Sequence, residues 1–496
     1  MNALSRLHPN RLGDLPRAVR RPRFARETLR PGIVHLGLGA FARAHLLACH
    51  DDALEAAGAA ASGWGVVGVS LRHADVRDAL APQGGLYSLA LRDAQATAWR
   101  VIGSLAGILV APEDPGAVLE RIAAPATRIV SLTVTEKGYC HDPATRALRF
   151  DHPDIVHDLA HPDAPRSAIG FLVHGLARRR ADGGAPLALV SLDNLPSNGD
   201  TLHGLVLAFA ERVSSGLVRW IERECSFPNS MVDRIVPRTT DADRAAAAAA
   251  LGCEDAAAVV AEPYFAWALE DRFAADRPDW AAGGARLVSR AEPWERLKLR
   301  MLNGAHSTIA YAGVLAGWPT VDEAMRQAPL ARFVAALMRE EIAPTLVESL
   351  PGVDLGAYAG ELLQRFANPA LAHRTAQIAM DGSQKLPQRL LGTVRDRLAA
   401  DAPVARLALA VALWLVHLHG VDEAGRAIAI DDPLAPALTA MVRDAAGDDH
   451  ARAALLAGFA PVFGDLACEP RWVDALAGGL RSLRERGVAA SLEAFA

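Results

Sequence analysis

The sequence predicts an α/β nucleotide-binding domain followed by a mainly α-helical domain. Strand-like and helix-like segments alternate from Gly32 to about Val236, a glycine-rich turn follows the first strand, and strand-like runs fade after about residue 285. A chain of 496 residues is also too long for one ordinary hydrophobic core. We therefore expect domains at residues 1–285 and 286–496, with the Pro- and Gly-containing stretch Asp276–Gly284 leading to the boundary.

The first half carries short apolar runs, each bounded by turn residues and separated from the next by a helix-compatible segment. The runs are Ile33–Leu36, Val66–Val69, Ile129–Val134 and Leu187–Leu192. This alternation is typical of βαβ units and of a mostly parallel, twisted sheet. The alanine-rich patch Ala245–Leu251 predicts a helix, because alanine has the highest helix propensity.

In the second half, amphipathic patterns rich in Ala, Leu, Arg and Glu replace the strands, for instance at Leu330–Glu341 and Gln388–Ala399. They predict a helical domain. The longest apolar run, Leu407–Leu415, is far shorter than the ~20 residues that a membrane-spanning helix needs. We expect it to form a buried helix.

Composition and charge restrict the class of protein. Hydrophobic residues make up 51% and charged residues 22%, which is the balance of a soluble globular protein. The formal charge of −5 argues against bulk attraction to nucleic acid or to an anionic membrane. The five cysteines are scattered without a C-x-x-C pair, and no signal-peptide pattern follows the N-terminal arginines. We expect buried, reduced cysteines in a cytoplasmic protein.

The segment Gly32–Ala42 runs from an apolar strand into a helix-compatible stretch and matches the pattern G-x-G-x-x-G/A. Gly37 would permit the tight turn, Gly39 would let the backbone approach a pyrophosphate, and the small Ala42 would let helix and strand pack closely. This context favours a dinucleotide-binding turn, and an ordinary turn between strand and helix is the alternative.

The residue that would contact the ribose is not evident. The second strand ends at Arg72, so no Asp or Glu stands at its tip. Arg72 could meet the 2′-phosphate of NADP, or it could be a solvated surface residue. At this point the choice between NAD and NADP stays open.

A helix-compatible segment over residues 294–307 combines a lysine, an asparagine and a histidine. On an α-helix at roughly 100° per residue, Lys298, His306 and Asn303 fall at about 0°, 80° and 140°, on one broad face. Leucines between them indicate partial burial. Two neighbouring arginines widen the polar side, so an ordinary solvated helix face is the alternative.

This combination suits the oxidation of an alcohol, which needs a base for the hydroxyl proton and a group that holds the developing alkoxide. Without zinc, a lysine whose pKa falls from about 10.4 toward about 7–8 can be the base. Asparagine amides can donate to the oxyanion. Asn194 lies in the polar turn after the Leu187–Leu192 strand, where open α/β sheets bind ligands, although a purely structural turn is the alternative.

Several motifs occur together over about residues 30–400. They are Ile33–His45, Thr133–Tyr139, Asp193–Gly199, Phe227–Pro237, Lys298–His306 and Asp381–Arg389. In wording and order they resemble the polyol-specific long-chain dehydrogenases, a family that includes mannitol 2-dehydrogenase, fructuronate reductase (D-mannonate oxidoreductase) and D-arabinitol 4-dehydrogenase.

The resemblance implies a metal-independent, NAD(P)-dependent dehydrogenase with its active site between the two domains. It implies that Lys298 is the general acid/base and that Asn194 and Asn303 hold the substrate oxygen. The implied substrate-binding residues are His306 as a hydroxyl contact, Glu295 as an acid near the proton route to solvent, and Asp233 and Lys385 as further active-site positions.

The cofactor is expected to be NAD, with NADP not excluded. Its expected contacts are Gly37, Gly39, Ala40, Phe41 and Thr135. Many relatives carry a histidine where this chain has Ala42, but alanine fits the close-packing role. The wording of Ala81–Tyr87, Thr133–Tyr139 and Asp381–Arg389 is nearer to fructuronate reductase than to mannitol 2-dehydrogenase. The expected reaction therefore interconverts D-mannonate and D-fructuronate, and mannitol 2-dehydrogenase or another polyol (arabinitol, sorbitol) dehydrogenase is the alternative.

Two rival functions come from other classes. A non-catalytic nucleotide-binding sensor would have no need of a lysine base beside two oxyanion amides. A zinc-dependent alcohol dehydrogenase would need converging Cys and His ligands, which the scattered cysteines do not indicate. We expect a small-molecule sugar acid or polyol as the only partner, with no nucleic acid and no membrane, and a monomer or small homo-oligomer.

Overall fold

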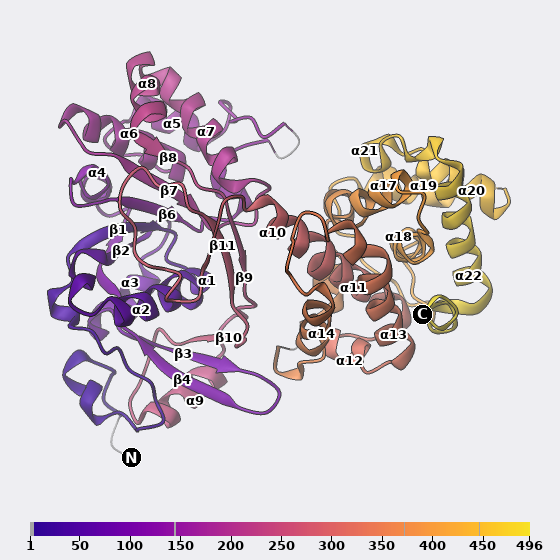
Figure 1. The fold of residues 1–496 in the computed structure, drawn as a ribbon, viewed down its shortest axis with the longest axis horizontal. Coiled ribbons are helices and arrows are strands. Elements are labelled where there is room, and N and C mark those ends of the chain that lie inside the picture. The colour runs from indigo at the N-terminus through magenta and orange to yellow at the C-terminus, as the bar shows by residue number, and fades with distance from the viewer. Residues whose placement is uncertain (1–3, 143–144, 372, 446) are drawn as a thin grey trace. The chain divides into compact units, whose positions relative to one another are not determined.

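The computed structural model describes residues 4–142, 145–371, 373–445 and 447–496. The chain forms two compact units, Met1–Glu292 and Pro293–Ala496 (Figure 1). Strand β12 (Arg286–Val288) pairs in parallel with β11 (Ala266–Glu270), and this pairing holds residues 286–288 in the first unit. The division thus falls a few residues after the expected boundary at 285/286.

A six-stranded sheet forms the centre of the first unit, in the order β5-β2-β1-β6-β7-β8. All of its recorded strand pairs are parallel, as the sequence predicted. The four predicted apolar runs form its four inner strands. The bounds are Leu105–Val110 (β5), Gly65–Ser70 (β2), Pro31–Leu36 (β1), Ile129–Leu132 (β6), Leu187–Ser191 (β7) and Cys225–Ser226 (β8).

Helices and small sheets cover both faces of this sheet, which explains why its inner strands are buried almost throughout. On one face, Val34, Val130 and Leu189 pack against helices α4, α6, α7 and α8. On the other, Ile33 and Ile129 pack with residues of α1, α2 and the small sheets. The helices are Ala40–Ala44 (α1), Leu46–Ala57 (α2), Asp75–Leu80 (α3), Pro115–Ala123 (α4), Pro153–Ala160 (α5), Ala168–Ala181 (α6), Asn198–Val213 (α7) and Ser215–Glu224 (α8).

Two three-stranded sheets complete the first unit. One has the order β10-β3-β4, with bounds Val259–Ala261, Tyr87–Arg92 and Thr97–Ile102. The other has the order β12-β11-β9, and β9 spans Ser230–Asp233. The alanine-rich patch lies in α9 (Asp241–Leu251), which begins with a capping box between Thr240 and Asp243, so that helix prediction is confirmed.

The described residues of the second unit form helices joined by loops and turns, with no strand among them, as predicted. Its α-helices are Glu292–Leu297 (α10, which starts at the division), Gly304–Ala316 (α11), Val321–Met325 (α12), Ala328–Ala336 (α13), Leu355–Phe366 (α14), Thr375–Ile378 (α15), Gly382–Leu386 (α16), Gly392–Ala399 (α17), Ala405–His417 (α18), Ala435–Asp444 (α19), Asp449–Ala457 (α20), Ala460–Phe463 (α21) and Pro470–Phe495 (α22). Three π-helical segments interrupt them at Lys298–Asn303, Leu337–Ile342 and Pro387–Leu391.

Helix α18 is the centre of this unit. Every residue of Leu407–Leu415 is buried, so the predicted buried helix is confirmed. No helix among the described residues combines the length and apolarity that a membrane crossing requires. Cys49, Cys140 and Cys253 are buried as expected, whereas Cys225 is half-buried and Cys468 is exposed.

Candidate functional site

The glycine-rich turn joins β1 to α1. Gly37 has a φ of +92°, and a Cβ at this position would lie 2.1 Å from the backbone oxygen of Thr133. The positive φ disfavours a side chain, and the collision with Thr133 excludes one. The conformation of the turn therefore requires glycine at position 37. The neighbouring strand fixes the turn further, because the N–H of Gly37 donates to the carbonyl oxygen of Val69 at 2.9 Å.

Gly39 differs from Gly37 because the fold itself does not require glycine there. Its φ of −80° suits any residue, and a Cβ would meet only the Gly37 carbonyl oxygen, at 3.9 Å. Gly39 is exposed, so its backbone is open to a close approach by a ligand such as a pyrophosphate. Ala40 begins α1, the ring of Phe41 stacks on His45, and Ala42 is fully buried as its close-packing role requires.

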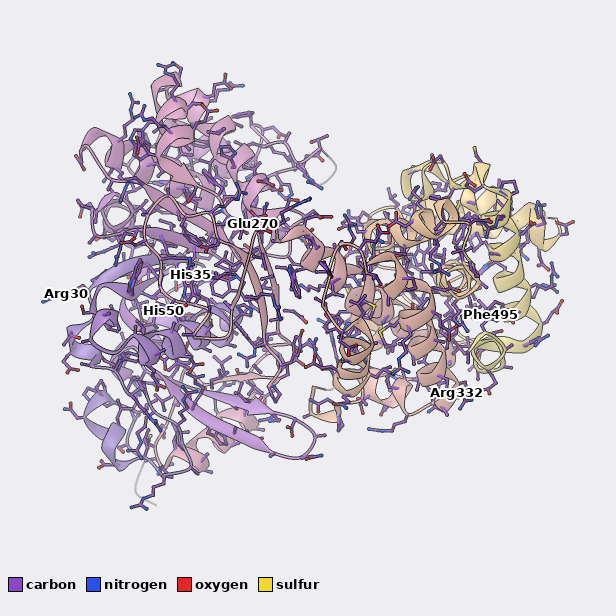
Figure 2. The ribbon with its side chains drawn as sticks, in the orientation of Figure 1. Arg30, His35, His50, Glu270, Arg332 and Phe495 are labelled. Atoms are coloured by element: carbon purple, nitrogen blue, oxygen red, sulfur yellow. The ribbon has the colours of Figure 1, made fainter. Side chains whose placement is uncertain are left out.

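A hydrogen-bond chain inside the sheet supports the turn. The Thr133 hydroxyl donates to the Gly37 carbonyl oxygen at 2.8 Å, so it accepts from Nε2 of His35 at 3.0 Å. Nδ1 of His35 then accepts from the Ser131 hydroxyl at 2.9 Å. Burial lowers the pKa of His35 to about 4, so the ring is neutral and this tautomer is fixed. His35 lies on β1 within the sheet (Figure 2).

At the tip of β2, Arg72 extends into solvent with 62% of its side chain exposed. Its guanidinium forms an ion pair with Asp154 at 3.1 Å, at the start of α5. The carboxylate paired with Arg72 therefore comes from a distant segment of the sequence. Arg72 is thus a solvated surface residue, and it is also a cation at the tip of β2, where a 2′-phosphate contact would be needed.

The motif Thr133–Tyr139 forms the connection after β6. Its Thr135 is exposed and has a φ of +63° and a ψ of 163°, a conformation that residues with side chains rarely adopt. The segment is held by Asp193, whose carboxylate accepts from the backbone N–H groups of Val134 and Thr135, each at 2.9 Å. The Tyr139 hydroxyl donates to the same carboxylate at 2.8 Å.

Asn194 follows directly after Asp193 at the carboxyl end of β7 and is exposed. Asp233 ends β9 and is 6% exposed, with its backbone paired to Ala266 of β11. Both therefore lie at the ends of strands in the first unit, together with Thr135 and the glycine-rich turn.

In the second unit, Lys298 and Asn303 belong to one π-helical segment. The regular α-helix assumed in the sequence analysis is therefore wrong here. The N–H of Gly304 reaches back five residues to the carbonyl oxygen of Leu299, and this wider turn brings residues five apart closer to one face than an α-helix would. Lys298 is half-buried and Asn303 is 9% exposed, so the segment is not a solvated face. Arg300 is buried too, donating to Thr345 and Asp396.

His306 lies one turn into α11, and its ring contacts those of Phe366 and His373, with both centroid distances at 5.2 Å. Burial lowers the pKa of His306 well below its usual value, and the positive charges around it lower the pKa further. The contributing groups are His373, Arg389, Arg365 and Lys385. His306 is therefore a neutral ring inside a cationic environment.

Lys385 lies on α16, which precedes the third π-helical segment. Its ammonium group donates to the backbone oxygens of Met380 at 2.5 Å and of Ile378 at 3.4 Å. Glu295 lies on α10, three residues before Lys298, and is half-buried. The second unit thus brings Lys298, Asn303 and His306 onto one continuous helical stretch, with Lys385 near enough to His306 to affect its pKa.

The predicted residues divide between the two units. Asn194, Asp233 and the five cofactor candidates belong to the first, and Lys298, Asn303, His306, Glu295 and Lys385 belong to the second. Sequence reasoning missed His35, Tyr139 and Asp193 as supports of the site. The signal for Asp193 was present, because it is an acid immediately after a buried strand and next to Asn194.

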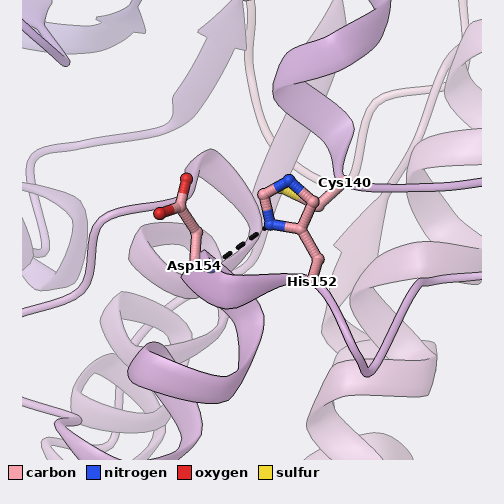
Figure 3. A group of neighbouring side chains, drawn as sticks. All are labelled: Cys140, His152 and Asp154. Atoms are coloured by element: carbon pink, nitrogen blue, oxygen red, sulfur yellow. Dashed lines mark hydrogen bonds between the residues drawn. The ribbon is translucent and has the colours of Figure 1, made fainter.

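Sequence reasoning also missed a cluster of Cys140, His152 and Asp154, whose ligand atoms lie within 4.8 Å of one another (Figure 3). Sulfur, imidazole and carboxylate are zinc ligands. However, Nδ1 of His152 accepts from the N–H of Asp154 at 3.2 Å, so the ring's proton is on Nε2 and neither nitrogen offers a free lone pair. Arg72 already pairs with the Asp154 carboxylate. This arrangement does not fit a bound zinc ion.

Comparison with known protein families covers nearly the whole chain. The family model of the mannitol dehydrogenase Rossmann domain matches residues 31–282. That of the mannitol dehydrogenase C-terminal domain matches residues 290–484.

Individual relatives show the same extent of similarity. D-mannonate oxidoreductase of Escherichia coli (strain K12) is 42% identical over 476 residues, covering 95% of this chain and 96% of the relative. Mannitol 2-dehydrogenase of Phaeosphaeria nodorum is 38% identical over 481 residues, covering 96% and 83%. The structure of Pseudomonas fluorescens mannitol 2-dehydrogenase, a ternary complex with NAD and D-mannitol, matches with a TM-score of 0.83 and 36% identity over 99% of both chains.

Proposed function

The chain belongs to the mannitol dehydrogenase family, as its motifs predicted, and we propose that it oxidises D-mannonate to D-fructuronate with NAD and catalyses the reverse reduction. Membership establishes the coarser part of this statement, a nicotinamide-dependent dehydrogenase acting on CH–OH groups. The substrate, the choice of NAD, the catalytic residues and independence of metal are our proposals.

The cofactor site is proposed to be the glycine-rich turn with Ala40, Phe41 and Thr135. The residues fit a dinucleotide, because the backbone at Gly39 is exposed and Gly37 holds the turn in its required conformation. A bound nicotinamide supplies a hydride acceptor for the oxidation and a hydride donor for the reverse reaction.

The catalytic base is proposed to be Lys298. Its amine takes the proton of the substrate hydroxyl, and Asn303, on the same face of the π-helical turn, donates to the oxygen as negative charge develops. We assign Asn194 as the second amide that donates to the substrate oxygen. Glu295 is assigned the relay of the Lys298 proton to solvent, and His306 and Asp233 are assigned contacts with the sugar hydroxyl groups.

The observation that favours a sugar acid over a neutral polyol is the cationic environment of His306. Lys385, Arg389 and Arg365 place positive charges close enough to depress the pKa of this ring. Positive charge at a substrate site stabilises a carboxylate more than it stabilises a neutral polyol. The greater identity to D-mannonate oxidoreductase than to mannitol 2-dehydrogenase agrees with this assignment.

The test is the change in absorbance of the reduced nicotinamide with a panel of substrates. D-mannonate, D-mannitol, D-arabinitol and D-sorbitol are compared with NAD and with NADP, before and after treatment with a chelator. We expect the highest kcat/KM with D-mannonate, and full activity after chelation. A preference for D-mannitol would replace the substrate assignment, and loss of activity on chelation that zinc restores would contradict metal independence.

A further inference from the structure

The carboxylate of Asp193 accepts three hydrogen bonds beside the predicted site, although Asp193 is not among the residues expected to contact ligands. Its side chain is 9% exposed and accepts hydrogen bonds from Val134, Thr135 and Tyr139. All three donors come from the segment between β6 and α5. A single carboxylate therefore holds two neighbouring strand ends together.

The backbone of Asp193 is fixed from its other side. Its N–H donates to the Ser191 hydroxyl at 3.3 Å, and its carbonyl oxygen accepts from the Asn198 amide at 3.1 Å. The Asn198 amide also donates to the backbone oxygen of Ser230 in β9 at 2.9 Å. The backbone of Asp193, the residue before Asn194, therefore has little freedom to move.

Thr135 needs such support because its backbone conformation is unfavourable. A residue with a side chain at this φ and ψ is strained, and the conformation persists only when surrounding contacts enforce it. The Thr135 N–H is held by Asp193, and its carbonyl oxygen accepts from the N–H of Gly138 at 3.0 Å. Two residues earlier, the Thr133 hydroxyl binds Gly37 of the glycine-rich turn.

We propose that Asp193 is a positioning residue that locks Thr135 and Asn194 into one rigid piece, so that the cofactor contact and the substrate-oxygen donor keep a fixed mutual geometry. This inference rests on the proposed function for the roles of Thr135 and Asn194. The placement of the two backbones by Asp193 does not depend on it.

The carboxylate must be ionised to do this. Two N–H groups and one O–H point at its oxygens, and replacing one oxygen by an NH₂ group would set a donor against a donor. The Ser191 hydroxyl, the remaining polar group beside it, binds the Tyr139 oxygen at 2.6 Å. Burial raises the pKa of Asp193 while the three donors lower it, and burial is the larger effect.

The decisive variant is Asp193→Asn, which keeps the size of the side chain. We expect kcat to fall about 10- to 100-fold, because displacements near 1 Å in an active site cost up to ~10²-fold. Hydrogen exchange of the Val134 and Thr135 amides should become faster. In the reduction direction, for which Lys298 must be protonated, the wild-type kcat/KM should decline on acidification with a midpoint above the ordinary carboxyl pKa as Asp193 is protonated, and this decline should be absent from the variant. Tyr139→Phe removes one of the three donors and should give a smaller change in the same direction.

Asp158→Asn is the matched control. Asp158 is fully buried in the first unit, and its carboxylate bonds the N–H groups of Arg166 and Ser167, the Ser167 hydroxyl and the His157 ring, none of which is assigned to the site. The Asp158→Asn substitution should lower the melting temperature and leave kcat unchanged. The proposal is overturned if Asp193→Asn keeps normal kcat and amide protection, or if Asp158→Asn lowers kcat equally. A wild type inactive on every sugar would refute the proposed function, while amide exchange would still decide the positioning.

Discussion

Lys298 and Asn303 stand at the two ends of one π-helical segment, and an i→i+5 hydrogen bond from Gly304 to Leu299 closes its last turn. In a regular α-helix the two side chains would point about 140° apart. The wider turn narrows this angle, which under the proposed mechanism would let an amine and an amide meet one substrate oxygen. π-Helical turns are rare and frequently occur at functional sites.

Lys298→Ala should abolish turnover with little effect on cofactor binding. Loss of a general acid/base costs about 10²–10⁴-fold in rate, and Lys298 belongs to the second unit whereas the glycine-rich turn belongs to the first. Steady-state kinetics and cofactor titration by fluorescence measure both effects. Arg296→Ala removes a cation two residues away and serves as the control. Retention of more than half of the wild-type activity by Lys298→Ala would remove this residue from the mechanism.

Gly37→Ala should lower the stability of the protein, whereas Gly39→Val should weaken cofactor binding. Alanine at 37 would collide with Thr133 in a conformation that disfavours side chains, so the melting temperature should fall. A Cβ at 39 meets only the Gly37 carbonyl oxygen, at 3.9 Å, so with valine there the fold should persist while cofactor affinity decreases more than substrate affinity. Thermal melts with cofactor titrations separate the two cases. Unchanged affinity in a folded Gly39→Val variant would show that the turn has only a structural role.

Arg72→Ala should reduce kcat/KM for NADP by about tenfold or more, since a hydrogen bond to a charged group contributes about 1.5–3 kcal/mol. The kcat/KM for NAD should change little, because NAD lacks the 2′-phosphate. Asp154→Ala removes the carboxylate that pairs with Arg72 and should raise activity with NADP. The ratio of kcat/KM for the two cofactors is the measurement. Equal losses with NAD and NADP would contradict a role for Arg72 at the ribose.

Asp51→Asn should stabilise the protein more at pH 8 than at pH 5. Asp51 is 1% exposed, and burial raises its pKa to about 7 even though Arg100 and the Gly103 N–H act in the opposite direction. In the unfolded chain the pKa is about 3.9. Between these values the folded state binds more protons, so the free energy of unfolding decreases as pH rises through this window. Asparagine retains an acceptor for Gly103 and removes the titration. Equal changes in melting temperature at both pH values would contradict the assignment.

The sheet and the helical unit could be predicted because local pattern and environment agree. The β-branched runs at Ile33–Leu36 and Leu187–Leu192 are buried on both faces, and Leu407–Leu415 is buried all round. The π-helical turn at Lys298 could not be predicted, because tertiary contacts select it. A Cβ on Gly304 would lie 2.9 Å from the backbone oxygen of Arg389, in another π-helical segment that packs against the first.

The supports of the candidate site were equally hidden. From sequence alone, Asp193 is an ordinary turn residue. Its role becomes visible only in the fold, which brings Thr135 and Tyr139 against it from 58 and 54 positions away in sequence. Arg72 and Asp154 meet across 82 positions. Residue type and motif order can therefore identify the groups that do the chemistry, whereas the groups that hold them are known only from long-range contacts.

Asn194→Ala and Asn303→Ala should each lower kcat more than they raise KM. The developing alkoxide carries more charge in the hydride-transfer transition state than the ground-state hydroxyl does, so a donor to that oxygen acts mainly on the barrier. Removing one such donor costs on the order of 3–4 kcal/mol, or roughly 10²–10³-fold in kcat. Asn229→Ala is the control, because that amide bonds Asp200 and Glu270, neither of which is assigned to the site. Kinetic constants and melting temperatures of the three variants separate the roles. Normal kcat with a lowered melting temperature for Asn194→Ala or Asn303→Ala would mark that amide as structural and leave Lys298 without its partner.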